Sequence, residues 1–171
     1  MDIIIDLQNY NKTETVIRRT ASRAIITDGN KYLLIFSKYG DYKFPGGGME
    51  KGEILEDTVV REVQEETGYH VVKDSIKKYI KVFEKRKGVH EDLLEMESYY
   101  YFCEIEKEIG ERNLDEYEEE YDYKVVWITL PEAIERNKLV IDLETCPWVI
   151  RDTNVMEQLV KEKEKNTRIR Q

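Results

Sequence analysis

Residues 47–69 constrain this chain more than any other segment, because they join a glycine turn, a charged helix and a second glycine. The pattern predicts a helix over residues 54–67. Gly68 follows it, and glycine tolerates the left-handed conformation that commonly ends a helix. Val59 and Val63 lie on one face of this helix, so we expect that face to pack on a β-sheet.

An acidic face adjoins the apolar one. On an ideal helix Glu62, Glu65 and Glu66 fall within one arc of about 100°. Like charges at this spacing repel, which weakens a helix by roughly 0.2–0.5 kcal/mol per pair. A bound cation would remove that cost, and oxygen-only ligands suit Mg²⁺ or Mn²⁺. We predict a site for one of these cations. A solvated charged face is the alternative, because 37% of the residues are charged.

Nine positions in and around this helix follow a fixed spacing, and in order they are Gly47, Glu53, Arg61, Glu62, Val63, Glu65, Glu66, Gly68 and Tyr69. This spacing resembles the Nudix box, and residues 44–47 resemble the usual approach to that box. Tyr69 is a mild departure, since an aliphatic residue is commoner there. The resemblance extends more loosely over residues 16–160. It implies an α/β fold, the Nudix-type α/β/α sandwich with a mixed β-sheet.

The same resemblance implies roles for individual residues of the box. Glu62 and Glu66 would be the principal metal ligands, and Glu65 would assist them or orient the nucleophilic water. Glu53 and Arg61 would form an ion pair that orients the loop and the metal-bearing helix. For this pair, an ordinary exposed ion pair on the helix surface is the alternative.

The charge of the chain limits its partners. With 27 basic and 36 acidic residues the net charge is −9, which argues against a broad basic surface for nucleic acid. It also repels an anionic substrate at long range. A phosphate group would therefore need local help from metal and placed cations. Arg23, in the basic stretch 15–23, is our candidate cation, and Gly46, Gly47 and Gly48 are candidates to present backbone groups to metal or phosphate. A plain turn is the alternative for these glycines.

A further glutamate outside the box often acts as base or metal ligand in the Nudix family. In this chain it should follow the strand expected at residues 95–106. Glu118, Glu119 and Glu120 fall there, within the acidic connector 108–122. In an extended segment Glu119 would face away from the other two. A solvated acidic loop is the alternative for all three.

Strands are expected at residues 16–27, 31–37, 42–44, 75–87, 95–106 and 123–130, with a hairpin turn at residues 28–30. Pro131 and Pro147 precede two helices that close the chain. A length of 171 residues suits a single domain over residues 1–171. Residues 1–14 are expected to form an N-terminal arm or a short strand, and residues 162–171 a frayed tail.

The sequence also predicts a cytoplasmic protein. It contains no run of eighteen apolar residues and no basic leader, so we expect neither a membrane span nor a signal peptide. Its two cysteines, Cys103 and Cys146, form no disulfide framework and no zinc pattern, which favours a reducing compartment. Homodimerisation is left open.

The resemblance implies Mg²⁺-dependent hydrolysis of a nucleotide-type small molecule: a nucleoside di- or triphosphate, or a nucleoside diphosphate linked to another group. Two alternatives use the same fold. One is a sensor domain that binds nucleotides without hydrolysis, although such domains commonly lose box glutamates. The other is an isoprenoid diphosphate isomerase, which needs a histidine-rich metal site that a chain with 2 histidines fits poorly. Markers of several known Nudix subfamilies are absent after the box, which mildly favours nucleoside triphosphates or an uncharted substrate.

Overall fold

The computed structural model describes residues 2–169, whose contacts divide into two compact units. Unit 1 holds the described parts of residues 1–26 and 45–113, and unit 2 those of residues 27–44 and 114–171. A single domain over residues 1–171 stays a prediction. No helix within residues 2–169 combines the length and the hydropathy that a membrane span requires.

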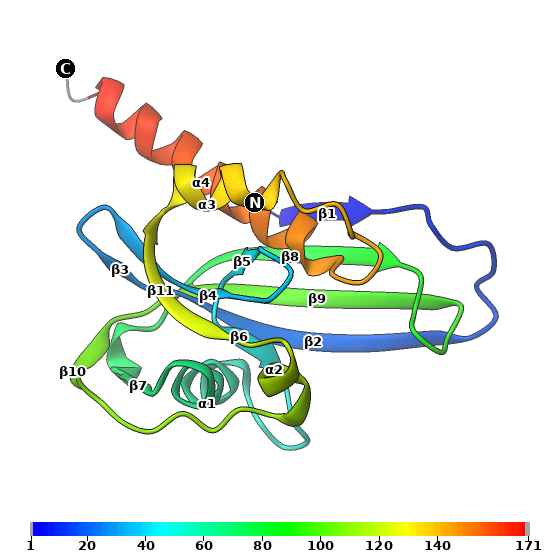
Figure 1. The fold of residues 1–171 in the computed structure, drawn as a ribbon, viewed down its shortest axis with the longest axis horizontal. Coiled ribbons are helices and arrows are strands. Elements are labelled where there is room, and N and C mark those ends of the chain that lie inside the picture. Colours follow the sequence, from blue (N-terminus) through cyan, green and yellow to red (C-terminus); the bar gives the residue numbers. More distant parts are fainter. Residues whose placement is uncertain (1, 170–171) are drawn as a thin grey trace. The chain divides into compact units, whose positions relative to one another are not determined.

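Unit 1 is built on a five-stranded sheet. The strands lie in the order β1 (Asp2–Asp6), β8 (Lys77–Arg86), β9 (Leu93–Phe102), β2 (Val16–Ile25) and β6 (Gly46–Gly48) (Figure 1). β1 runs parallel to β8, and β2 runs parallel to β9, whereas β8–β9 and β2–β6 are antiparallel pairs. The mixed sheet is therefore confirmed. The N-terminal segment contributes a strand to it, which was one of the two expectations for residues 1–14.

Helix α1 (Leu55–Thr67) covers one face of this sheet (Figure 1). Val59 and Val63 are 0% exposed, and the Ser22 hydroxyl of β2 donates to the backbone oxygen of the first helical residue at 2.7 Å. Gly68 has φ 79° and ends the helix as expected. Burial of the apolar face fixes the rotation of α1 about its own axis, and this also fixes the orientation of the acidic face relative to the sheet.

Two parts of unit 1 differ from the sequence expectations. The three glycines expected to form a turn pair with β2 as strand β6. The strand expected at residues 95–106 is divided into β9 and β10 (Ile105–Ile109), and β10 pairs with β7 (Tyr69–Val71) in a separate two-stranded sheet. A short 3₁₀ helix, η1 (Lys73–Ser75), precedes β8.

Unit 2 contains the second main sheet. Its strands are β11 (Lys124–Thr129), β4 (Lys31–Phe36) and β3 (Thr27–Asp28), and β5 (Tyr42–Lys43) also pairs with β4. The expected hairpin between β3 and β4 is confirmed, with Gly29 at φ 60°. The described part of unit 2 also contains three helices, which are α2 (Glu116–Glu120), α3 (Leu130–Asn137) and α4 (Trp148–Ile169).

Helices α2 and α4 correct two expectations. The acidic connector 108–122 is not extended around residue 119, because a capping box between Asp115 and Glu118 starts α2 there. The predicted frayed tail is helical as far as Ile169, the last residue of α4. The rest of that tail, residues 170–171, lies outside the described residues.

Candidate active site

Two carboxylates of α1 lie close together in unit 1. One oxygen of Glu62 and one of Glu66 are within 4.8 Å of each other. Both residues are buried, with exposures of 8% for Glu62 and 0% for Glu66. Placing two ionised carboxylates at this distance away from water is unfavourable unless a cation or a proton lies between them. A donor set made of carboxylate oxygens fits a hard cation such as Mg²⁺ or Mn²⁺.

The glycine strand β6 holds this acidic face. The Gly46 N–H donates to Oε2 of Glu66 at 2.9 Å. A Cβ atom at Gly47 would overlap the Glu62 carboxylate, and one at Gly46, where φ is 146°, would overlap the backbone of Ser22. Glycine is therefore required at both positions, at Gly47 to admit the Glu62 carboxylate and at Gly46 to pair closely with β2 in a positive-φ conformation.

Arg61 links the loop before α1 to the acidic face. Its guanidinium binds both carboxylate oxygens of Glu53, from Nε at 2.6 Å and from Nη2 at 3.0 Å. Nη1 donates to Glu62 at 2.9 Å and to Glu65 at 3.1 Å, and Nη2 also reaches the Gly48 carbonyl at 3.0 Å. A planar fork with five donors suits this divergent set of acceptors, whereas a lysine would not reach them all.

These contacts shift two pKa values. The hydrogen bonds from Arg61 lower the pKa of Glu53 to about 2. The same contacts with Glu53, followed by the charge of Glu62, raise the pKa of Arg61. Both groups therefore stay ionised at neutral pH.

Glu65 is placed differently from the other two box glutamates. Its carboxylate accepts from Arg61, and its backbone oxygen accepts from the Asn113 N–H at 2.8 Å. The structure thus brings Glu62 and Glu66 together and directs Glu65 toward Arg61.

Arg23 lies beside the glycine strand. It faces Gly46 in the β2–β6 register, and its Nη1 donates to the Gly46 carbonyl at 3.2 Å. The residue is only 5% exposed, and its buried Nε has no hydrogen-bond partner among the described residues. A buried cationic donor without a partner is costly and suits an anionic or carbonyl ligand.

Sequence reasoning did not single out two other arginines. Arg19 shares a strand face with Arg23, and its Nη2 lies 3.1 Å from the position of a Cβ on Gly48. Arg112 donates from Nε to the backbone oxygen of Glu66 at 2.7 Å and so holds the end of α1. Strand alternation within residues 15–23 could have indicated Arg19, whereas no local signal indicates Arg112.

The three glutamates expected outside the box belong to unit 2. Glu118 is 3% exposed. Its carboxylate accepts hydrogen bonds from the Asp115 N–H at 2.9 Å and from the Tyr117 hydroxyl at 3.2 Å. Glu119 and Glu120 are exposed, and Glu120 lies 3.6 Å from the Lys38 ammonium. The alternation expected of an extended segment is wrong, because helix α2 carries all three residues. Only Glu118 among them is buried.

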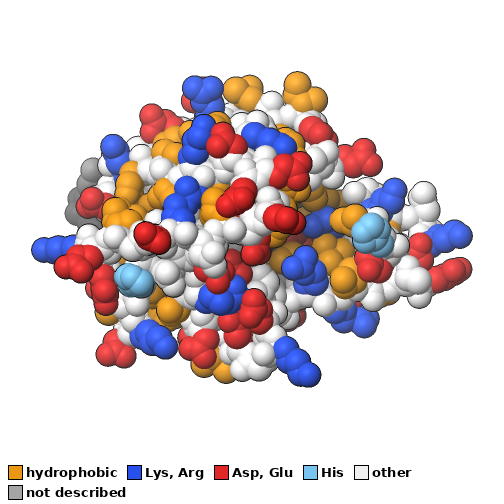
Figure 2. Space-filling model, turned by 60° about the horizontal axis from the view of Figure 1, so that its bottom comes forward, with side chains coloured by type: hydrophobic (Ala, Val, Ile, Leu, Met, Phe, Trp, Pro, Cys, Tyr) orange, Lys and Arg blue, Asp and Glu red, His pale blue; other side chains and the backbone are white. Residues whose placement is uncertain are grey.

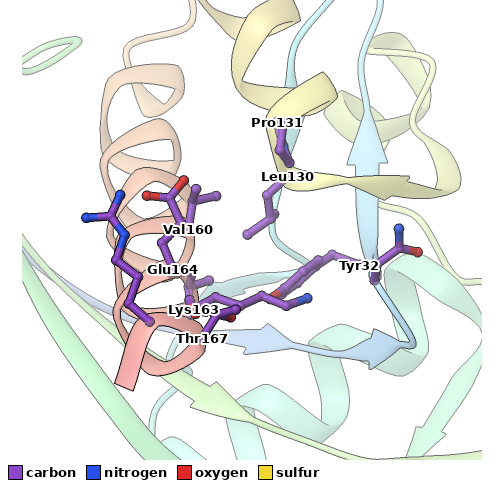
Figure 3. A pocket seen from close by; sticks show the side chains of 10 residues that line it. Tyr32, Leu130, Pro131, Val160, Lys163, Glu164 and Thr167 are labelled. Carbon is purple, nitrogen blue, oxygen red and sulfur yellow. Dashed lines mark hydrogen bonds between the residues drawn. The ribbon is translucent and has the colours of Figure 1, made fainter. Parts of the chain in front are cut away.

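Unit 2 also contains a cavity of about 520 Å³ between β4, the start of α3 and the second half of α4. Figure 3 shows Tyr32 and Leu130 facing α4 side chains that include Val160, Lys163 and Thr167. None of the residues that line it belongs to the predicted site, so the cavity adds no candidate to that site.

On the face drawn in Figure 2, acidic and basic side chains are interspersed, and no broad basic patch is seen on that face.

Comparisons with known proteins agree with the box and the fold. Residues 17–148 match the Nudix domain. The chain is 36% identical over 110 residues to the putative 8-oxo-dGTP diphosphatase YtkD of Bacillus subtilis (strain 168), a match that covers 64% of this chain and 63% of YtkD. It is 50% identical over 48 residues to an ADP-ribose pyrophosphatase of Methanocaldococcus jannaschii, which covers 26% of this chain and 28% of that protein.

The chain thus spans less than two thirds of the length of either relative. A solved structure, the MutT Nudix hydrolase from Burkholderia pseudomallei, has a TM-score of 0.54 and 21% identity, over 67% of this chain and 85% of that one. It shares the mixed α/β fold. Because the Nudix domain match covers most of the sequence, the chain belongs to the Nudix family.

Proposed function

We propose that this protein is a divalent-metal-dependent hydrolase of a phosphorus-containing anhydride. Its substrate would be a nucleoside di- or triphosphate, or a nucleoside diphosphate linked to another group. The observation that carries the proposal is the buried pair Glu62 and Glu66, whose carboxylate oxygens lie within 4.8 Å of each other. The names of the two relatives, a diphosphatase and a pyrophosphatase, support the same reaction class.

Glu62 and Glu66 would hold the metal, Mg²⁺ or Mn²⁺, with Glu65 assisting. When bound, such an ion neutralises charge on phosphate oxygens and lowers the pKa of a water molecule. Arg61 fixes Glu62 and Glu65 on one side of this site, and Gly46 fixes Glu66. We assign the Nε of Arg23 to a phosphate oxygen of the substrate.

Hydrolysis in this proposal is attack by water on phosphorus, with cleavage of the bridging P–O bond and departure of phosphate, pyrophosphate or, for a linked substrate, a phosphorylated group. A carboxylate accepts the proton of the attacking water. We assign this role to Glu65, or to Glu118 as the buried member of the acidic run. Glu118 is ordered by the α2 capping box, which favours it over Glu119 and Glu120.

We place the protein in the cytoplasm in this proposal. Cys103 and Cys146 are both free and buried, and burial raises the pKa of Cys103 to about 12 and that of Cys146 to about 11. Both are therefore neutral at pH 7, and it is their unpaired state that fits a reducing compartment.

A substrate panel tests the proposal. The products would be separated by chromatography after incubation with dGTP, 8-oxo-dGTP, ADP-ribose and a dinucleoside polyphosphate, each with and without Mg²⁺. We expect the protein to hydrolyse at least one of these compounds. This activity should require metal and should be lost in Glu66→Gln. Nucleotide binding without release of any product would instead identify the non-hydrolytic sensor domain.

A further inference from the structure

A short segment of unit 1 after β10, residues 110–113, lies against the C-terminal end of α1 (Figure 1). The Asn113 N–H donates to the backbone oxygen of Glu65 at 2.8 Å, and Nε of Arg112 donates to the backbone oxygen of Glu66 at 2.7 Å. The last carbonyls of a helix have no partner within the helix itself. In α1, two of them find their partners in a segment that is distant in sequence.

Glycines allow this close approach. The Gly110 N–H donates to the Gly68 carbonyl at 2.7 Å. A Cβ atom at Gly68, where φ is 79°, would lie 2.5 Å from the Gly110 carbonyl oxygen, which is well inside van der Waals contact. Gly68 is therefore needed for two reasons: it adopts the left-handed conformation that ends α1, and it leaves room for the segment 110–113.

Glu65 and Glu66 are held at both their side chains and their backbone. The Glu66 carboxylate accepts from the Gly46 N–H at 2.9 Å, and the Glu65 carboxylate accepts from Nη1 of Arg61 at 3.1 Å. The backbone oxygens of both glutamates are bound by the segment 110–113. Since a side chain moves with the backbone that carries it, the orientation of each carboxylate depends on both sets of contacts.

Arg112 also brings a positive charge to an end of α1 that has none of its own. The last turn of the helix, residues 64–67, contains Glu65 and Glu66 but no basic residue. The C-terminal end of a helix carries a partial negative charge, so acidic side chains there are unfavourable and a cation is favourable. Through its bond to the Glu66 carbonyl, the Arg112 guanidinium lies at this end. It therefore opposes the fraying that the clustered carboxylates promote.

We propose that Arg112 is a positioning residue for the metal site. By fixing the last turn of α1, it keeps the Glu65 and Glu66 carboxylates in the orientation that a divalent cation requires, without binding the cation itself. The inference rests on the proposed function, because it concerns the metal of that reaction. Residues that orient metal ligands typically change the affinity for the metal by about 10–100-fold when they are replaced.

Calorimetry with Mn²⁺ tests the inference without turnover. We expect Arg112→Met, which loses the charge and the donors but keeps an unbranched side chain, to bind Mn²⁺ about 10–100-fold more weakly than the wild type. Arg112→Lys should recover part of this affinity, because an ammonium group keeps the charge and can still donate. The matched control is Arg18→Met, which removes the same charge from an exposed ion pair with Glu95 in unit 1. It should bind Mn²⁺ like the wild type.

Hydrogen exchange measures the position of the Glu66 carboxylate in the absence of metal. The Gly46 N–H donates to this carboxylate, so its exchange is slow only while the carboxylate stays in place. Arg112→Met should lose this protection. The Ala24 N–H donates to the Pro45 carbonyl at 2.8 Å and reports the neighbouring contact between β2 and the start of β6. Its protection should be unchanged.

Turnover assays separate metal binding from substrate binding. In Arg112→Met, the Mg²⁺ concentration that gives half-maximal activity should rise by about 10–100-fold. The KM for the substrate at saturating Mg²⁺ should stay within about twofold of the wild type, because Arg112 acts through the metal ligands. A general loss of structure would instead lower activity at every metal concentration.

Two results would overturn the inference. One is a folded Arg112→Met protein with wild-type Mn²⁺ affinity or wild-type exchange at Gly46. The other is equal weakening of Mn²⁺ binding in Arg18→Met. Circular dichroism and thermal melts identify a variant that fails to fold. In that case Arg112→Gln, which keeps a neutral N–H donor, takes the place of Arg112→Met and is judged by the same outcomes.

The positioning role and the hydrolase fail separately. A wild-type protein that neither binds Mn²⁺ nor hydrolyses the substrate panel rejects the hydrolase, and exchange at Gly46 then still decides whether Arg112 fixes Glu66. Metal-dependent turnover by the wild type, together with unchanged metal affinity and unchanged Gly46 exchange in Arg112→Met, rejects the positioning role alone.

Discussion

Arg61 and Glu53 form a two-pronged ion pair across eight positions of the chain, with N···O distances of 2.6 and 3.0 Å. The same carboxylate also accepts from the Glu50 N–H at 2.9 Å and from the Thr58 hydroxyl at 2.8 Å. Glu53 therefore joins the loop before α1 to the helix. Since Arg61 also holds Glu62 and Glu65, the geometry of the acidic face depends on this pair.

The pair should make folding stability sensitive to acid. Arg61 lowers the pKa of Glu53 to about 2 from an ordinary value of 4.5. The ionised Glu53 carboxylate therefore contributes fully to folding stability above pH 4.5, and this contribution is lost as pH falls through 2. We expect Glu53→Gln to lower stability at pH 7 by about 1–3 kcal/mol. The difference in folding stability between Glu53→Gln and the wild type should disappear as pH falls from 4.5 to 2. Thermal melts across this range measure it, and a gap that stays constant would contradict the assignment.

Helix α1 could be predicted nearly to the residue, because the apolar repeat of Val59 and Val63 and the stop at Gly68 are local signals. The helical period of 3.6 residues also predicted that Glu62 and Glu66 lie on the same side of the helix. Strand β6 was missed, since three glycines have no side-chain pattern and pair only through distant backbone bonds to β2.

Helix α2 could have been found. Asp115 and Glu118 have the spacing of a capping box, but the uniform acidity of the connector favoured a solvated loop. The partners of Arg61 and the burial of Arg23 could not have been predicted, because they depend on tertiary contacts between segments that are distant in sequence.

Activity should require a divalent cation. Three carboxylates on one helix arc form no closed protein cage, so we expect millimolar Mg²⁺ or Mn²⁺ to be needed. Either ion should also raise the melting temperature, since a ligand that binds only the folded state stabilises it. Turnover assays and thermal melts with a series of metal concentrations test both effects. Full turnover in excess EDTA would reject the metal site.

Glu66→Gln should keep the fold and lose catalysis. Gln is nearly isosteric and its carbonyl still accepts from the Gly46 N–H, but the metal site loses one negative charge. We expect kcat to fall by at least about a hundredfold, and stability without metal to be unchanged or slightly higher because a like-charge repulsion is relieved. The exposed Glu56 in the first turn of α1 provides the control. If Glu56→Gln and Glu66→Gln had similar kcat values, Glu66 would not be a metal ligand.

Gly47→Ala should disturb the site through sterics alone. The added methyl group would overlap the Glu62 carboxylate, so either this carboxylate or strand β6 must move. We expect a loss of about 1–3 kcal/mol in stability and weaker metal binding in calorimetry. Gly40→Ala is the control, because a Cβ at Gly40 meets nothing within 4 Å, although its φ of 83° adds backbone strain. Wild-type stability together with wild-type metal affinity in Gly47→Ala would contradict the close approach of Gly47 to the Glu62 carboxylate.

Among the three glutamates of α2, only Glu118 should matter for turnover. It is the buried one, and Gln at this capping-box position still accepts the Asp115 N–H, so Glu118→Gln removes the charge without removing the cap. We expect kcat to fall by about 10²–10⁴ in Glu118→Gln, with loss of the acidic limb of its pH–rate profile. Glu119→Gln and Glu120→Gln should stay within about twofold of wild type, because exposed side chains pay no desolvation cost and have no fixed direction. Three variants with wild-type profiles would leave Glu65 as the base, since its carboxylate is already oriented by Arg61.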